Sequence, residues 1–273
     1  MSNPQPTDAL DELPFAAPCK TLQLSAPLQW LGAGWRDFRI GWRASLVYGM
    51  AMAILIALSC AAAWQFGSYT FVFAMLGGFV FVAPLSCTGL YAISAQIERN
   101  EPVSLRRALR AGFRRYLGNE MVFALMLLVL FLVWARAGAL VHVFFPANSD
   151  AGLSEFVVFL GIGTAVGAVF AALTFSASAF ALPMIVHRRV DAVTAVVTSV
   201  NAVLRNKRVM AVWLLVAVLG TALGIVTGFV PLVVILPVIG HAAWHGYLET
   251  IDASAFPRHS AGVTAQPRSA KTQ

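Results

Sequence analysis

Charged residues are scarce in this sequence. Of its 273 residues, 11% are charged and 59% are hydrophobic, and the mean hydropathy is +0.77. A soluble domain carries about 25% charged residues, because they cover its surface. The shortage therefore excludes a soluble globular domain, and it predicts an all-α polytopic membrane protein. The net charge of +7 would suggest a nucleic-acid partner only in a soluble chain, so no nucleic-acid binding is expected.

Cysteine is also scarce, with three residues at Cys19, Cys60 and Cys87. The last two fall in separate apolar runs, at predicted membrane depths that differ by about 15 Å. A disulfide needs Cα atoms within about 7 Å, so no bridge is expected. No C-x-x-C spacing for a metal is present. We predict that Cys19 is a free thiol in a polar tail and that the other two pack within the membrane.

Sequence motifs for catalysis are missing. The chain has no Walker loop, nucleophile elbow, Gly-rich nucleotide loop, Ser/His/Asp set or paired carboxylates within its apolar runs. An energy-coupled pump is therefore not indicated. The sequence leans towards a non-catalytic protein without a cofactor, although it does not decide the point.

Long apolar runs are what the sequence has instead. Six of them are long enough for a membrane helix, which needs about 20 residues to cross about 30 Å of hydrocarbon. The predicted spans are 44–66, 70–94, 121–145, 156–186, 210–229 and 231–248. Only a turn around Gly228 and Pro231 separates the last two, so this pair could instead form a re-entrant hairpin.

Polar segments flank the apolar runs at both ends of the sequence. Residues 1–24 lack the basic start and apolar core of a signal peptide. Residues 251–273 are rich in Ser, Ala, Pro and Thr. We predict two disordered cytoplasmic tails around a membrane domain of residues 25–250.

Basic residues predict the orientation. Eighteen of the 19 Lys and Arg residues fall in segments that lie on one side of the six-span model, and the loops on the other side contain none. Cytoplasmic loops carry such an excess, so both termini are predicted to be cytoplasmic. The exception is Arg136, within the third run, which we expect to extend to the outer interface. All seven Trp residues are expected near an interface.

Three inner segments read as amphipathic helices, and each precedes a pair of spans. They cover residues 28–43, 104–117 and 190–205, with Ser104 as a predicted N-cap of the second. In the first, the predicted apolar stripe is Leu28, Leu31, Trp35, Phe38 and Trp42, and the arginines lie off it. The order predicts three tandem parallel repeats of one interfacial helix and two spans. The alternative is that any cytoplasmic loop tends to be basic and amphipathic. Contact with anionic lipid headgroups is predicted for Arg36, Arg39, Arg43, Arg106, Arg107, Arg110, Arg114 and Arg115.

Histidines are the candidate ligands. His241 and His245 are four residues apart and so share a helix face, and His187 is predicted at a similar depth. Three imidazoles could bind a metal or haem. The alternative, which we favour, is that they are interfacial anchors that hydrogen-bond headgroups or loop carbonyls. No metal and no cofactor is therefore predicted.

Small residues and prolines predict how the spans pack. Close helix–helix contact is predicted at glycines that recur every four residues, namely Gly163, Gly167, Gly220, Gly224 and Gly228. Kinks are predicted at Pro84, Pro183 and Pro237, which lie in spans two, four and six, the second span of each predicted repeat.

Two segments resemble a known family. Residues 188–195 (RRVDAVTA), continuing to 203–206 (VLRN), and residues 237–245 (PVIGHAAWH) are similar to bacterial integral membrane proteins that are catalogued as a domain of unknown function. Some members carry the label "putative cytochrome c oxidase subunit I". A haem–copper subunit has more spans and more intramembrane histidines than this sequence, so the label conflicts with it. The resemblance implies a bacterial inner membrane and brings no activity with it.

Two classes of function remain. The first is a non-catalytic scaffold, regulator or assembly factor that contacts anionic lipid, with an unknown protein partner. The alternative is a passive or gradient-driven carrier of a small or amphiphilic molecule. The scarcity of ionisable residues in the apolar runs favours the first. A redox component that binds haem or metal is a more distant third.

Overall fold

The computed structural model describes residues 14–66, 69–109, 117–144 and 153–259. Over this part of the chain the regular structure is helical, and strand pairing is limited to two isolated bridges. The all-α class is confirmed. The helices are α2 (Ala26–Ile40), α3 (Trp42–Phe66), α4 (Tyr69–Ser86), α5 (Thr88–Glu98), α7 (Leu117–Phe144), α8 (Leu153–Ser178), α9 (Ala181–His187), α10 (Ala192–Arg205), α11 (Lys207–Val226) and α12 (Leu232–Thr250).

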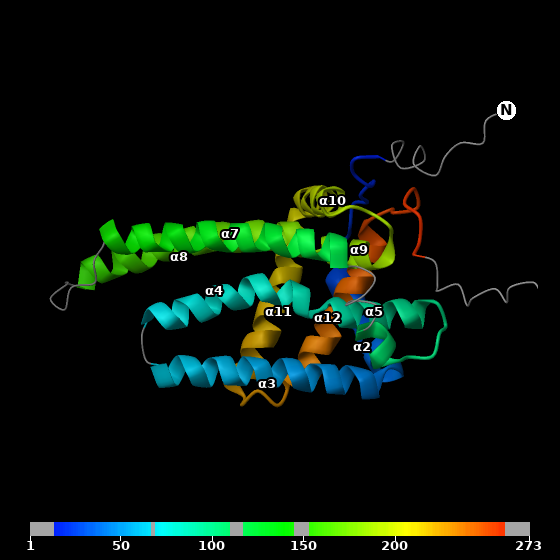
Figure 1. Ribbon diagram of the computed structural model, residues 1–273, viewed down its shortest axis with the longest axis horizontal. Helices are drawn as coiled ribbons and strands as arrows, with labels where there is room; N and C mark the ends of the chain where they lie inside the picture. The colour runs from blue at the N-terminus through cyan, green and yellow to red at the C-terminus, as the bar shows by residue number, and fades with distance from the viewer. Residues whose placement is uncertain (1–13, 67–68, 110–116, 145–152, 260–273) are drawn as a thin grey trace, which may run out of the picture.

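Six stretches of described helix are long and apolar enough to cross a membrane, which confirms the predicted number of candidate spans. They are Trp42–Phe66, Gly78–Glu98, Gly118–Leu140, Gly161–His187, Lys207–Val226 and Leu232–Thr250. In Figure 1, α3, α4, α7 and α8 run along the long axis of the molecule, whereas α11 and α12 cross that direction.

The second and fourth candidate spans are each broken into two helices. The chain passes from α4 to α5 just after Pro84, and from α8 to α9 just before Pro183. A proline ring clashes with the carbonyl four residues earlier, which for Pro183 is that of Ala179 at the second break. The sixth candidate span, α12, stays continuous through Pro237.

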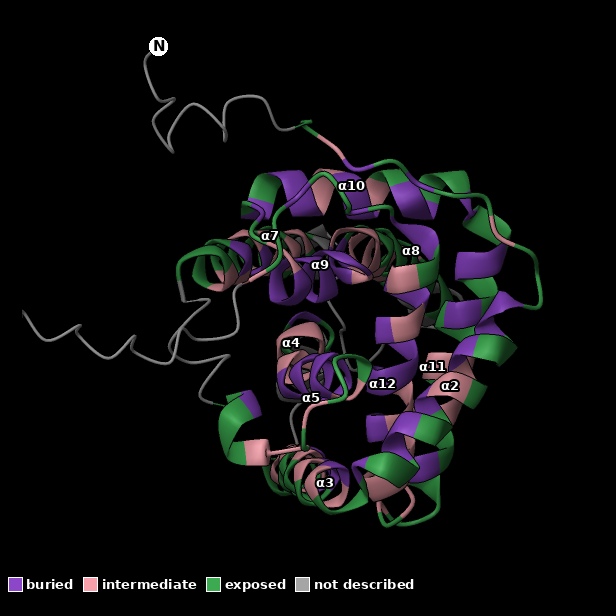
Figure 2. Cartoon of the chain, turned by 90° about the vertical axis from the view of Figure 1, so that its right-hand side faces the viewer, coloured by how far each residue is buried: buried purple, intermediate pink, exposed green. Residues whose placement is uncertain are grey.

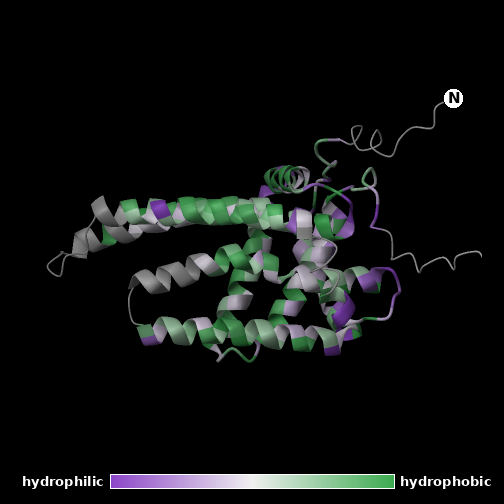
Figure 3. Ribbon diagram, in the orientation of Figure 1, coloured by the Kyte–Doolittle hydropathy of each residue, from purple (hydrophilic) through white to green (hydrophobic). Residues whose placement is uncertain are grey.

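The long helices expose large apolar side chains. Leu58 on α3, Leu125 on α7 and Leu219 on α11 are all exposed. Soluble proteins rarely expose contiguous apolar patches, so these faces suit lipid. Figure 3 shows the long helices as mainly hydrophobic, with hydrophilic residues gathered at the end where α2 and α5 lie.

Buried residues concentrate at that same end, where α5, α9 and α12 meet (Figure 2). Trp30, Trp213 and Trp244 are buried there, so these three indoles pack in the protein core rather than facing lipid. The rings of Trp30 and Trp213 pack edge to face, with centroids 5.5 Å apart. Each indole contributes apolar area and shape to the core.

Helix α2 is docked tightly on α12, with its small residues facing inwards. Its buried face includes Ala26, Trp30 and Gly34, whereas Leu28 and Trp35 of the predicted apolar stripe are exposed. Helix α10 behaves alike, burying Thr194, Ala195, Thr198, Ser199 and Ala202. In both helices, much of the predicted apolar face is exposed, and small residues pack on the bundle instead.

The order of one short helix followed by two spans occurs three times along the described chain. The first unit is α2, α3 and α4–α5, and the third is α10, α11 and α12. In the second unit, only residues 105–109 of the short helix are described, before α7 and α8–α9. Ser104 caps this helix, because its Oγ accepts a hydrogen bond from Arg107 N at 3.3 Å.

Parts of both predicted tails are packed on the bundle. Ala17 N donates to Thr198 Oγ1 at 3.0 Å, and Lys20 N donates to Thr250 O at 2.8 Å. Arg189 N donates to Pro257 O at 2.8 Å. The prediction of disorder is therefore corrected for residues 14–24 and 251–259, whose backbone groups bond to the helices or to each other. Residues 1–13 and 260–273 lie outside the described chain.

Candidate functional site

Five polar side chains form one hydrogen-bonded chain among four helices, which we call the Asp37 chain. Its members are Asp37 on α2, Ser45 on α3, Ser94 on α5, and His241 and His245 on α12. Four of them are buried, while His245 keeps 22% of its side chain exposed. The chain joins α2 to the bundle through polar contacts in an otherwise apolar core.

The distances along the Asp37 chain are uniform. Ser45 Oγ lies 2.9 Å from His241 Nε2, and His241 Nδ1 lies 2.8 Å from Ser94 Oγ. Ser94 Oγ donates to Asp37 Oδ2 at 2.9 Å, and His245 Nε2 lies 2.8 Å from the same Oδ2. All four are normal hydrogen bonds, and those to an ionised carboxylate are the stronger kind.

Proton counting fixes the tautomer of His241 when Asp37 is ionised. A serine hydroxyl has one hydrogen, and that of Ser94 is donated to Asp37. His241 Nδ1 must therefore carry a hydrogen and donate it to Ser94 Oγ. In the neutral ring, Nε2 then accepts from the hydroxyl of Ser45. Every hydrogen bond of the Asp37 chain thus points towards one carboxylate.

Helix periodicity and small residues bring the five side chains of the Asp37 chain together. His241 and His245 share the α12 face that meets α2. A methyl group on Gly34 would lie 2.6 Å from Ala242 N, and one on Gly240 would lie 2.5 Å from Leu90 Cδ1. These glycines let α2 and α5 approach α12 closely enough for short polar side chains to meet.

His187 lies apart from the Asp37 chain. Its Nδ1 is 2.9 Å from the hydroxyl of Tyr247, and its ring centroid is 5.4 Å from that of Trp244. At about 100° per residue, Trp244 and Tyr247 occupy a different face of α12 from His241. His187 therefore bonds to a different set of side chains from His241 and His245. No group of three potential metal ligands occurs among the described residues.

The hydrogen-bond partners expected for these histidines, headgroups or loop carbonyls, differ from those observed. His241 is fully buried, and His187, His241 and His245 bond to side chains on helices. Sequence reasoning missed Asp37, Ser45 and Ser94. One signal was available for Asp37, because it is the only acidic residue between positions 13 and 97 and lies beside Arg36 and Arg39.

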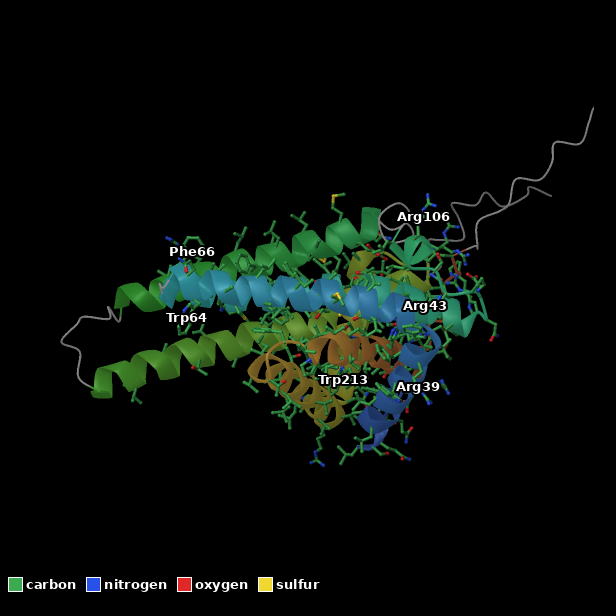
Figure 4. All side chains as sticks on the ribbon, turned by 90° about the horizontal axis from the view of Figure 1, so that it is seen from below. Arg39, Arg43, Trp64, Phe66, Arg106 and Trp213 are labelled. Carbon is green, nitrogen blue, oxygen red and sulfur yellow. The ribbon has the colours of Figure 1, made fainter. Side chains whose placement is uncertain are left out.

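The predicted lipid-contacting arginines gather at one end of the molecule. Figure 4 shows Arg39, Arg43 and Arg106 at one end of the long helices, with Trp64 and Phe66 at the other. We call the first of these the arginine end. The described members of the predicted set are Arg36, Arg39, Arg43, Arg106 and Arg107, and all are exposed. Arg110, Arg114 and Arg115 lie outside the described chain.

Two of these arginines have partners within the protein. The guanidinium of Arg43 lies 5.2 Å from the centre of the exposed Trp42 ring. Arg107 Nη1 is 3.4 Å from Glu101 Oε2. Both contacts are near the surface, where each contributes little to stability and leaves the cation accessible.

The predicted packing glycines divide into three groups. Gly220 and Gly224 face α12, since added methyl groups would meet Ile235 at 3.3 Å and Leu232 at 2.2 Å. Gly228 belongs to the turn before α12 and has a φ of +89°, which favours glycine. At Gly163 and Gly167, an added methyl group would meet no described atom within 4 Å, so the described helices do not make the contact predicted there. Arg136 is exposed on α7.

Comparison with known proteins finds a family model that matches part of the chain. Residues 71–187 match the model of the family described as "Predicted integral membrane protein (DUF2189)". This match confirms the resemblance to an integral membrane family of unknown function. No curated protein and no solved structure matches the chain.

Proposed function

We propose that this integral membrane protein is a non-catalytic scaffold or regulator that binds anionic lipid at its arginine end. The observation that carries the proposal is the exposed surface of α2 and of the start of α3. Arg36 and Arg39 on α2 and Arg43 on α3 are exposed, and so are Leu28 and Trp35 on α2. Apolar side chains next to cations are typical of helices that lie in a membrane interface.

The energetics favour anionic lipid over neutral lipid. Each basic side chain near an anionic surface contributes about 1 kcal/mol, and the effect falls off within a Debye length. Arg106 and Arg107 extend the same cationic surface from the next inner segment. The excess of basic residues supports an orientation in which the arginine end faces the cytoplasmic leaflet, which this proposal takes to be that of a bacterial inner membrane.

Lipid analysis tests the proposal. The protein and a variant in which Arg36, Arg39, Arg43, Arg106 and Arg107 are all changed to Gln would be extracted in native lipid, and the co-purifying lipids measured by mass spectrometry. We expect the variant to lose most of its enrichment in acidic lipid. Arg136→Gln is the matched control, because this arginine lies far along α7 from the cluster. Equal enrichment in all three proteins would contradict the proposal.

A carrier remains the second candidate, and the Asp37 chain is the observation that favours it. The scarcity of ionisable residues in the spans argued against a carrier, yet Asp37 and His241 are both buried in the bundle. Buried acid–histidine chains occur in gradient-driven transporters. Purified protein in vesicles would dissipate an imposed pH gradient faster than empty vesicles if it carried protons or a protonated molecule. An unchanged rate would leave the scaffold as the better reading.

A further inference from the structure

We infer that Arg188, Arg258 and Arg99 form a binding site for one phosphate group, and we expect a lipid headgroup to be its source. None of these three arginines belongs to the lipid-contacting set proposed above, so the inference goes beyond that set. It rests on the proposed function only in taking an anionic lipid as the expected ligand. The observation behind it is a guanidinium that the protein holds without an ion-pair partner.

Arg188 is a partly buried cation whose hydrogen-bond partners are neutral. Its Nη1 atom donates to the carbonyl of Phe256 at 2.9 Å, and the hydroxyl of Tyr247 lies next to the same guanidinium. Its Nε atom is buried and has no hydrogen-bond partner among the residues that the structure describes. Asp252 acts on Arg188 from an exposed position, where water weakens the attraction. A guanidinium does not lose its proton in proteins, so a bound anion is what would balance this charge.

Two further guanidinium groups converge on the same position. Residues 188 and 258 pair in an isolated antiparallel bridge, in which opposite side chains project to the same side with Cβ atoms about 4.5–5.5 Å apart. The charges of Arg188, Arg258 and Arg99 all reach the buried ring of His187, at the end of α9. Figure 1 shows α5, α9 and the red carboxyl-terminal segment at the same end of the molecule. Three segments far apart in sequence therefore bring three cations together.

The nearest carboxylates neutralise this cluster weakly. Glu98 Oε1 is 4.0 Å from Arg258 Nη2, and Glu101 Oε1 is 4.0 Å from Arg99 Nη1. Both distances are long for an ion pair, and exposed pairs of this kind contribute little. Glu101 is also closer to Arg107, at 3.4 Å. An anion with several acceptor oxygens would therefore find donors that the protein's own carboxylates leave available.

Phosphate has the geometry that this arrangement favours. A guanidinium presents several N–H donors in one plane, and arginine binds phosphate oxygens in pairs of parallel hydrogen bonds. One phosphate oxygen would accept from Nε of Arg188, and the others would accept from Arg258 and Arg99. The side chain of Arg258 is 60% exposed, so it can move to admit the ligand and then contact it. Basic pockets between membrane helices bind acidic headgroups in this way.

Native mass spectrometry of the full-length protein in detergent tests the inference. The anionic probe is phosphatidylglycerol, and the control lipid is phosphatidylcholine, whose own choline neutralises its phosphate. We expect one phosphatidylglycerol molecule to stay bound to the wild type and none of the control lipid. Arg258→Gln should weaken this binding about tenfold or more, as the loss of a charge-assisted hydrogen bond implies.

Arg189→Gln is the matched control, because it removes the same charge from the next residue. The backbone at Arg188 is extended, so the side chain of Arg189 projects to the opposite side, and this variant should bind as the wild type does. Arg188→Lys is a second variant of the site itself. It keeps the positive charge and removes the Nε donor, so it should also weaken binding.

Competition with glycerol 3-phosphate distinguishes the two sources of phosphate. Displacement of the lipid at equal concentration would assign the site to a free phosphate ester, and retention of the lipid would assign it to a headgroup. The variant in which Arg36, Arg39, Arg43, Arg106 and Arg107 are changed to Gln keeps this site, so it should retain the single bound molecule whether or not it loses bulk enrichment in acidic lipid. Equal binding of the two lipids by the wild type, or unchanged binding in both Arg258→Gln and Arg188→Lys, would overturn the inference.

Discussion

Gly34 sets the distance between α2 and α12. An added methyl group would lie 2.6 Å from both Ala242 N and Val238 O, which are backbone atoms that cannot move aside as a side chain can. The hydrogen bonds between the Asp37 carboxylate and the side chains of His245 on α12 and Ser94 on α5 depend on this close approach. A single missing Cβ therefore supports both the packing of α2 and the geometry of the Asp37 chain.

We expect Gly34→Ala to lower the thermal denaturation midpoint in detergent. Overpacking at such a contact costs about 1–3 kcal/mol. Gly32→Ala on the same helix is the control, because its added methyl group would meet no atom within 4 Å. That change should be neutral or stabilising, since alanine in a helix is favoured over glycine by about 0.5–1 kcal/mol. Equal midpoints for the two variants would show that α2 is not tightly docked.

Cys19 provides a second test at a single residue, because it lies in the packed segment before α2. Burial raises the pKa of its thiol, and the charge of Arg205 opposes this effect in part. Since the thiolate is the reactive form, a raised pKa leaves less of it at any given pH below the pKa. The rate of alkylation should therefore rise at higher pH than for an ordinary cysteine.

The measurement uses a variant with Cys60→Ser and Cys87→Ser, so that Cys19 is the remaining thiol. Maleimide labelling against pH gives the profile directly. The control carries Phe15→Cys and Cys19→Ser in the same background, because Phe15 is 68% exposed on the same segment. Overlapping profiles for the two thiols would mean that residues 14–24 are not packed on the bundle.

At the level of whole elements, residues 251–259 pack against the end of α9, and we call this segment the strap. Phe256 is 2% exposed, and its carbonyl accepts a hydrogen bond from Arg188 Nη1 at 2.9 Å. The backbone of Arg189 also bonds this segment, through Pro257. The strap therefore closes the end of the bundle where α9 meets α12.

Phe256→Ala should destabilise the protein strongly. Truncation of a buried phenylalanine typically costs about 3–5 kcal/mol, from lost apolar burial and the cavity left behind. Phe15→Ala is the matched control, because the same truncation at an exposed ring removes little burial. Chemical denaturation in detergent would compare the two. Similar midpoints for both variants would contradict the strap.

The elements also explain what sequence could and could not predict. The six spans were predictable because the length of an apolar run is a local property. The inward face of α2 was not, because both lipid and the protein core are apolar, so hydrophobic periodicity cannot distinguish them. Small residues mark the packed face instead, as Ala26 and Gly34 do on α2.

The candidate site was predictable only in part, for a related reason. The pairing of His241 with His245 on one face follows from helix spacing. Their partners Asp37, Ser45 and Ser94 come from three other helices and depend on how these pack. Such long-range contacts are not encoded in local spacing.

On the scale of the whole molecule, the α11–α12 hairpin differs in direction from the four long helices, which it crosses in Figure 1. Leu232 and Leu236 of α12 pack against Ala53 and Ile56 of α3. Phe229, in the turn, packs on the same cluster. Helix α3 continues for ten residues past Ile56, to Phe66, which is about 15 Å of helix. The turn therefore lies level with the interior of α3, as a re-entrant hairpin would place it.

Labelling from outside the cell distinguishes a re-entrant hairpin from two full crossings. In a background without native cysteines, Trp64→Cys and Val230→Cys would be treated with a membrane-impermeant maleimide, first on intact spheroplasts and then after detergent. Both positions are exposed, at 90% and 76%. With the arginine end on the cytoplasmic side, as proposed above, we expect Trp64→Cys, at the opposite end of α3, to react in spheroplasts. Val230→Cys should react only after detergent, because hydrocarbon would cover the turn. Equal labelling of both cysteines in spheroplasts would show instead that α11 and α12 cross the membrane fully and that the turn reaches the outer surface.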